Sequence, residues 1–196
     1  KVTGVQTCAL PISPGSSAGG SGFEDLGNAL EAARPLTLAV VNGGLYGGAS
    51  DIALACDFRL GIQATEMFVP ASRLGLHFYR SGMERFVSRL GVDMAKRVLL
   101  WGEKLDAQAL LRCGFFSALY PSAEELQQAA DSLCTQLSQL APLSVQPMKR
   151  HLNAMARHAL DAERLADDIE RARTSNDLRE GSAALRERRP PVFQGR

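Results

Sequence analysis

The sequence predicts an α/β protein, in which a core of alternating strands and helices is followed by a helical C-terminal segment. A β-prone, mostly apolar run at residues 36–41 ends in an Asn-Gly turn, and a helix-like segment follows the glycine pair at 47–48. After residue 142 the chain is rich in Ala, Leu, Arg, Asp and Glu, as packed helices are. Its 196 residues suffice for a domain of this kind without disulfides or metals.

The first half of the predicted core contains two helices and two strands. The first helix has leucines four residues apart and stops before Pro35, which cannot follow a residue in helical conformation without strain. The run at 36–41 is apolar on both faces, which is typical of a strand covered on both sides. The predicted elements are a helix at 24–33, a strand at 36–41, a helix at 47–56 and a strand at 58–61.

Helical periodicity dominates the rest of the chain. Ser81 with Glu84, and Ser122 with Glu125, each form the Ser-x-x-Glu pattern of a capping box and predict two helix starts. The predicted elements are strands at 67–69 and 115–120, helices at 81–90, 94–101, 106–113 and 122–140, and packed helices from 142 up to a proline-broken tail.

The chain is expected to begin with a segment foreign to the fold. Residues 2–12 resemble the translation of a sequencing-library adapter, and residues 14–22 are mostly too small to bury enough apolar surface to become ordered. We therefore predict a non-native or disordered leader at 1–22, a truncated α/β core at 23–140 and a helical segment at 141–196.

Composition narrows the classes of partner. The chain is 45% hydrophobic and 22% charged with a net charge of +1, so bulk charge favours neither nucleic acid nor a membrane surface. No apolar run approaches the roughly 20 residues of a membrane-spanning helix. The four cysteines form no CxxC pair and no histidine lies at metal-ligand spacing, so we expect no metal site and a reducing, cytoplasmic location.

The segment with the most chemical information is residues 39–60, where the apolar strand leads through a glycine-rich turn into a helix. A helix N-terminus has unpaired N–H groups and partial positive charge, which can hold an oxyanion, and a glycine lets the ligand approach the backbone. Asp51, three residues after Gly48, would lie in the first turn and could act as an acid or base. The same residues also suit a tight turn and a favourable charge at a helix start, so both interpretations stay open.

These motifs resemble the signature of the enoyl-CoA hydratase/isomerase (crotonase) superfamily. V-N-G at 41–43, G-G-A-S-D-I at 47–52 and C-D-F-R at 56–59 match the family pattern, and the resemblance covers roughly residues 23–196. It implies a crotonase-like ββα spiral core with a helical C-terminus, acting on an acyl-CoA through a thioester enolate. No cofactor is implied beyond the coenzyme A of the substrate. Relatives form trimers or pairs of trimers, so we expect a homotrimer or hexamer.

The resemblance assigns roles to individual residues. Gly48 matches the backbone oxyanion donor and Asp51 the first acid/base carboxylate, and these are the predicted catalytic residues. Hydratases of the family have a second carboxylate where this chain has Ala71, and Asp51 is one methylene shorter than their glutamate. We expect hydration or isomerisation, while decarboxylation and C–C cleavage through the same enolate stay open. The predicted substrate-binding residues are Tyr46, Gly47, Ala71, Leu74 and His77.

Other interpretations of the same segment stay open. His77 and Tyr79 could replace the missing carboxylate, although a lone loop histidine is more often packed than catalytic. Ser50 as a nucleophile with His77 as its base would instead resemble a serine hydrolase of the Clp type. The absent second carboxylate would also suit a non-catalytic homologue that binds coenzyme A.

Overall fold

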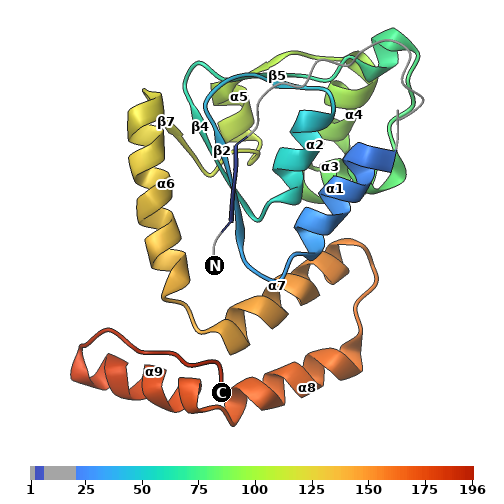
Figure 1. Cartoon of the computed structure of the whole chain (residues 1–196). Coiled ribbons are helices and arrows are strands. Elements are labelled where there is room, and N and C mark those ends of the chain that lie inside the picture. Colours follow the sequence, from blue (N-terminus) through green and yellow to red (C-terminus); the bar gives the residue numbers. More distant parts are fainter. Residues whose placement is uncertain (1–2, 7–20) are drawn as a thin grey trace. The chain divides into compact units, whose positions relative to one another are not determined.

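A computed structural model of the chain describes residues 3–6 and 21–196, and it confirms an α/β core and a helical C-terminal part (Figure 1). The chain divides into two compact units. The α/β unit comprises residues 3–33 and 37–131, and the C-terminal unit comprises residues 34–36 and 132–196.

Two small sheets organise the α/β unit. In the first, all neighbouring strands are parallel, and helix α2 makes the crossover between two of them, as parallel pairing requires. In the second, one pair is parallel and one antiparallel. The first sheet has the order β1 (Thr3–Gln6), β2 (Thr37–Val41), β4 (Phe58–Ile62), β7 (Ala118–Tyr120), and the second has the order β3 (Leu45–Tyr46), β5 (Glu66–Phe68), β6 (Leu105–Asp106).

Strand β1 lies within the predicted leader. Residues 3–6 pair in register with residues 37–40 of β2, so part of the segment that we assigned to a leader belongs to the sheet. Helix α1 likewise begins at Ser21, inside the predicted leader. Residues 1–2 and 7–20 lie outside the described part of the chain.

Helices make up most of the remaining structure, close to their predicted positions. Within the described residues none is both long and apolar enough to cross a membrane. The α/β unit contains α1 (Ser21–Ala32), α2 (Gly48–Ala55), a 3-10 turn η1 (Ala71–Leu74), α3 (Arg80–Leu90), α4 (Val92–Lys96), a π-helical turn η2 (Arg97–Trp101) and α5 (Ala107–Arg112). Helix α6 (Ala123–Ser138) leads into the C-terminal unit, which contains α7 (Pro142–Ala156), α8 (Ala162–Arg173) and α9 (Asn176–Glu187).

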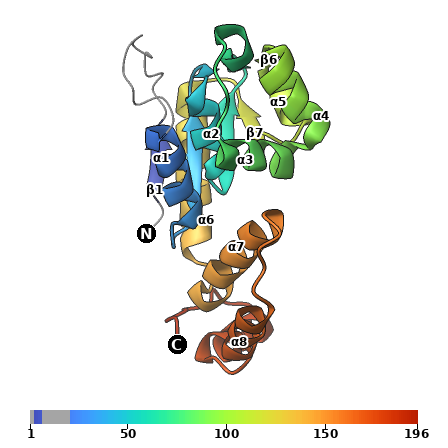
Figure 2. The same ribbon diagram turned by 90° about the vertical axis from the view of Figure 1, so that its right-hand side faces the viewer.

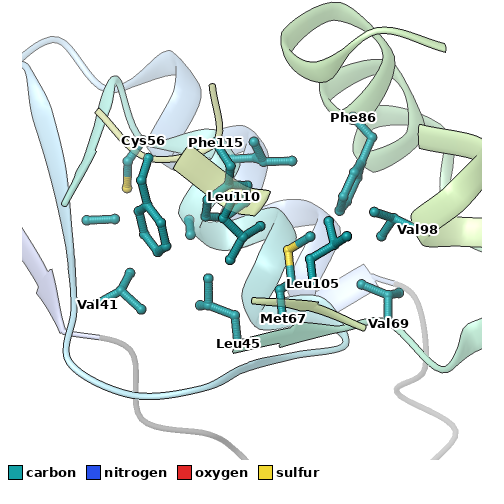
Figure 3. Packing of buried hydrophobic residues seen from close by; sticks show 14 of the residues in the cluster. Val41, Leu45, Cys56, Met67, Val69, Phe86, Val98, Leu105, Leu110 and Phe115 are labelled. Carbon is teal, nitrogen blue, oxygen red and sulfur yellow. The ribbon is translucent and has the colours of Figure 1, made fainter. Parts of the chain in front are cut away.

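The core of the α/β unit surrounds helix α2. Residues 50–55 of α2 are all buried, and the predicted burial of β2 on both faces is confirmed by Leu38, Ala39 and Val41. Figure 3 shows side chains from β2, β3 and β5 meeting Leu110 and Phe115 in one apolar cluster. A helix packed on all sides has little freedom to shift, so the core fixes the position of the α2 N-terminus.

One of the two predicted capping boxes is confirmed and the other is wrong. Before α6, the Ser122 hydroxyl accepts the N–H of Glu125 at 3.2 Å. Helix α3 begins instead at Arg80, and the hydroxyl of Ser81 donates to Glu24 of α1 at 2.8 Å. A carboxylate from a neighbouring helix has replaced the local cap, which a pattern within one helix cannot reveal.

Polar contacts join the parts of the C-terminal unit. His151 of α7 contacts Asp168 of α8 with 2.9 Å between Nε2 and Oδ2. The Asp177 carboxylate of α9 accepts the backbone N–H groups of Gln194 at 2.8 Å and Gly195 at 2.9 Å. The tail therefore folds back along α9.

Candidate active site

The turn between β3 and α2 presents an unpaired backbone donor. Gly47 has φ 56° and ψ −126°, a conformation that residues with side chains rarely adopt, and its N–H donates to the Phe68 carbonyl at 3.0 Å. Gly48 begins α2, and its N–H has no acceptor within the described residues. The helix start thus offers one free N–H at its positive end.

A phenylalanine of α1 covers Gly48. A Cβ at position 48 would lie 2.8 Å from Cδ1 of Phe23, too close for any side chain. This glycine was predicted to allow the approach of a substrate, and the packing of Phe23 gives a second reason for a glycine at this position. The ring provides an apolar wall beside the free amide.

Asp51 is wholly buried and accepts three hydrogen bonds from two side chains. Its exposure is 0%, and both of its oxygens accept hydrogen bonds from Arg85, with Nε at 2.7 Å from Oδ1 and Nη2 at 2.6 Å from Oδ2. The Tyr79 hydroxyl donates to Oδ2 at 2.7 Å. The carboxylate lies in the first turn of α2, as predicted, but it faces two protein groups of α3 rather than solvent.

The ion pair extends into a network across three helices. Nη1 of Arg85 lies 3.3 Å from Glu31 of α1, which also binds Arg89 at 2.8 Å. Burial opposes the charge of Arg85, but hydrogen bonds and charges of Asp51 and Glu31 outweigh it and raise the pKa of the guanidinium above its ordinary value. Figures 1 and 2 both show α1 beside α2, and each of them contacts α3.

A glycine of α1 lets the network close. A Cβ at Gly27 would lie 2.6 Å from Nη2 of Arg85 and 3.1 Å from Oδ2 of Asp51. The absence of a side chain at this helical position therefore lets α1 pack directly against the ion pair.

Tyr79 connects the network to the surface. It is half-buried at the N-cap of α3, and its ring stacks on Phe78 with 4.8 Å between centroids. Burial, the hydrogen bond to Asp51 and the charge of that carboxylate raise the pKa of Tyr79 above its ordinary value. The phenol thus stays protonated and donates its hydrogen to Asp51.

Two of the predicted substrate-binding residues share an apolar groove of about 250 Å³. Ala71 and His77 line it together with Ser72, Leu76 and Phe78, and side chains of α3, α4 and η2 form the rest of its wall. His77 is exposed, and its Nδ1 lies 2.7 Å from the Phe78 carbonyl. The groove suits an apolar group, and these residue roles stay predictions.

Tyr46 and Leu74 are not among the groove's lining residues. The Tyr46 hydroxyl donates to Glu66 at 2.5 Å, and Leu74 is 61% exposed on η1. Ser50 is buried, and its hydroxyl has no hydrogen-bond partner within the described residues. The structure therefore does not bring Ser50 and His77 together as a hydrolase would need.

Phe23, Glu31 and Arg85 were not predicted from the sequence. A partial signal was present, because Arg85 and Arg89 are four residues apart and so lie on one face of a predicted helix. That spacing does not show which carboxylates the two arginines contact. Glu31, for example, lies more than fifty residues away in the sequence.

Comparisons with known proteins agree on one family. A family model described as enoyl-CoA hydratase/isomerase matches residues 17–196. The carnitinyl-CoA dehydratase of Proteus mirabilis (strain HI4320) is 28% identical over 189 residues, which are 93% of this chain and 72% of that protein. The 2,3-dehydroadipyl-CoA hydratase of Escherichia coli (strain K12) is 30% identical over 167 residues, 83% of this chain and 64% of that protein. A solved structure of an enoyl-CoA hydratase/isomerase family member, 25% identical, matches with a TM-score of 0.81 and is spanned to 65% of its length by 88% of this chain.

Proposed function

Because this chain belongs to the enoyl-CoA hydratase/isomerase family and has its crotonase fold, we propose that it acts on an acyl-CoA thioester through an enolate intermediate. The thioester oxygen would accept the N–H of Gly48, and coenzyme A would be present only as part of the substrate. The free Gly48 amide, at the start of a helix that the core holds in place, carries this proposal.

The amide suits the charge that develops during enolisation. When the α-carbon loses a proton, negative charge moves to the thioester oxygen, and a fixed donor at a helix N-terminus stabilises that charge more than it stabilises the neutral thioester. Removal of one such donor typically costs about 10²–10³ in rate. The Phe23 ring gives the donor an apolar neighbour.

The apolar groove suits the acyl group. Its walls include Ala71, Leu76 and Val87, and Ala71 brings no carboxylate to the position where a hydratase would activate water. This supports isomerisation, which moves a proton between two carbons, over addition of water. The known relatives include a dehydratase and a hydratase, so water addition is the second candidate reaction.

The test is exchange of the α-hydrogen of butyryl-CoA in D₂O, catalysed by the complete gene product. Proline is tolerated at the first position of a helix and lacks the N–H, so Gly48→Pro removes the proposed donor selectively. Because a side chain at 48 would meet Phe23, the substitution is made in a Phe23→Ala background, with Phe23→Ala alone as the control.

We expect the double variant to exchange about 10²–10³ times more slowly than its control. Equal rates would remove Gly48 from the mechanism. Binding of butyryl-CoA by the wild-type protein without any exchange would instead identify a non-catalytic homologue.

A further inference from the structure

We propose that Tyr79 exchanges the proton with the substrate, and that Asp51 accepts the hydroxyl proton of Tyr79 in the same step. This inference rests on the proposed enolate chemistry and names the groups that move the proton. It replaces direct contact between Asp51 and the substrate with a two-residue relay.

Burial separates Asp51 from any substrate. Its exposure is 0%, with Arg85 bound to both oxygens and Gly27 of α1 packed against Oδ2. Arg85 is itself 1% exposed. Of the side chains that hydrogen-bond to Asp51 in the described part of the chain, Tyr79 is the one with surface exposure, so a proton can leave the carboxylate through its hydroxyl.

Tyr79 contacts both a lining residue of the groove, Phe78, and the Asp51 carboxylate. Its ring stacks on Phe78, which lines the groove, and its oxygen is 2.7 Å from Oδ2 of Asp51. Asp51 is one helical turn from Gly48, the proposed oxyanion donor. The relay requires that a thioester held at Gly48 place its α-carbon within reach of the phenol.

The relay balances protons and electrons. The α C–H bond breaks, its electron pair forms the enolate, and the negative charge resides on the thioester oxygen at Gly48. The released proton bonds to the Tyr79 oxygen as the existing O–H bond of Tyr79 breaks, and that hydrogen passes to Oδ2 of Asp51. Reversal of these transfers returns a proton to the α-carbon, or to the γ-carbon of an unsaturated chain, which completes an isomerisation.

The charges around Asp51 include a second carboxylate, that of Glu31, which also contacts Arg85. Arg85 keeps a counter-ion in Glu31, whose Oε2 lies 3.3 Å from Nη1, while Asp51 holds the proton. A tyrosinate, in contrast, would face the Asp51 charge directly, in line with the raised pKa of the phenol. Tyr79 therefore passes protons to and from Asp51 and does not accumulate as an anion.

The test compares the Tyr79→Phe and Tyr120→Phe variants in the α-hydrogen exchange of butyryl-CoA. Tyr79→Phe removes one hydroxyl and keeps the ring that stacks on Phe78. Tyr120→Phe removes a hydroxyl from β7, outside the site, and serves as the matched control. We expect exchange to fall by about 10²–10⁴ in Tyr79→Phe, as for loss of a general acid or base, with unchanged binding of butyryl-CoA and unchanged exchange in the control.

A second comparison tests the coupling to Asp51. In a relay, the double variant Tyr79→Phe with Asp51→Asn exchanges no more slowly than the slower single variant, because both residues serve one step. Multiplicative losses would overturn the relay, as would wild-type exchange in Tyr79→Phe. Those results leave the enolate proposal intact, whereas the absence of exchange in the wild-type protein would contradict that proposal itself.

Discussion

Two arginine–carboxylate pairs in this chain have the same separation and opposite surroundings. Arg85 and Asp51 are 2.6 Å apart, with side chains 1% and 0% exposed. Arg189 and Glu180 of the C-terminal unit are also 2.6 Å apart, but 39% and 25% exposed. The distance alone says little about energy, because water screens the second pair and is absent from the first.

The two pairs also differ in what they join. Arg85 and Asp51 connect α2 to α3 and, through Glu31, to α1, so three segments of the core depend on them. Arg189 and Glu180 connect α9 to the tail that directly follows it. We therefore expect the buried pair to matter for folding and catalysis, and the exposed pair to matter for the tail alone.

The largest effect is expected from Arg85→Met, which removes the counter-ion of the buried Asp51 and leaves Glu31 with Arg89. Removal of one partner of a buried pair typically destabilises a protein by roughly 3–5 kcal/mol. Urea unfolding of Arg85→Met and of Arg189→Met measures the contrast, and we expect little change in the second. Equal, small losses in both variants would show that burial does not separate the two pairs.

The next effect is expected from Gly27→Ala. Alanine in a helix interior is ordinarily better than glycine by about 1 kcal/mol, but here its Cβ would lie 2.6 Å from Arg85. We expect a net destabilisation of roughly 1–3 kcal/mol, as for overpacking of a filled core. Gly22→Ala is the control in the same helix, since among the described residues its Cβ would meet no atom within 4 Å beyond its own stretch of helix. Thermal unfolding of both variants measures the difference. A Gly27→Ala variant that is more stable than the wild type would mean that α1 does not press on the ion pair.

The smallest effect is expected from titration of Glu180. The hydrogen bond from Arg189 and the N–H of Val192 lower the pKa of this carboxyl from its ordinary 4.5 to about 2. A carboxyl with a lowered folded-state pKa stabilises above its unfolded-state pKa, and this contribution is lost as pH falls toward the folded-state pKa. The Val192 amide resonance should therefore move as the pH passes through about 2, while the lost stability appears between about pH 4.5 and 2; both effects shrink in high salt. A resonance that stays constant over this range would show that Glu180 does not bind the Val192 amide.

The elements that sequence could predict are those whose signal is local. The helices and strand β2 follow from spacing of apolar residues within one segment, and the glycine turn before α2 follows from the residues at 47–48. Strands β3 and β6 have two residues each and are defined by their partners, so periodicity could not reveal them. Strand β1 at residues 3–6 was not predicted for a similar reason, because it is defined by its pairing with β2.

The candidate site was also predictable only where its signal is local in the sequence. The position of Asp51 in the first turn of α2 follows from sequence, but its pairing with Arg85, 34 residues later, depends on how two helices pack. Tyr79 was considered as a replacement for the missing carboxylate, and its hydrogen bond to Asp51 became visible only in the structure. Contacts between charged residues of different helices leave no periodic pattern in the sequence, so they could not be predicted from it.

The most direct test of the account is the rate at which the complete gene product exchanges the α-hydrogen of butyryl-CoA in D₂O, for wild type and Tyr79→Phe. We predict stereospecific deuterium incorporation by the wild-type protein and a loss of about 10²–10⁴ in the variant, with thioester binding preserved in both. Incorporation at the same rate in both would contradict the role of Tyr79, and bound thioester without incorporation in the wild type would contradict enolate chemistry at the start of α2.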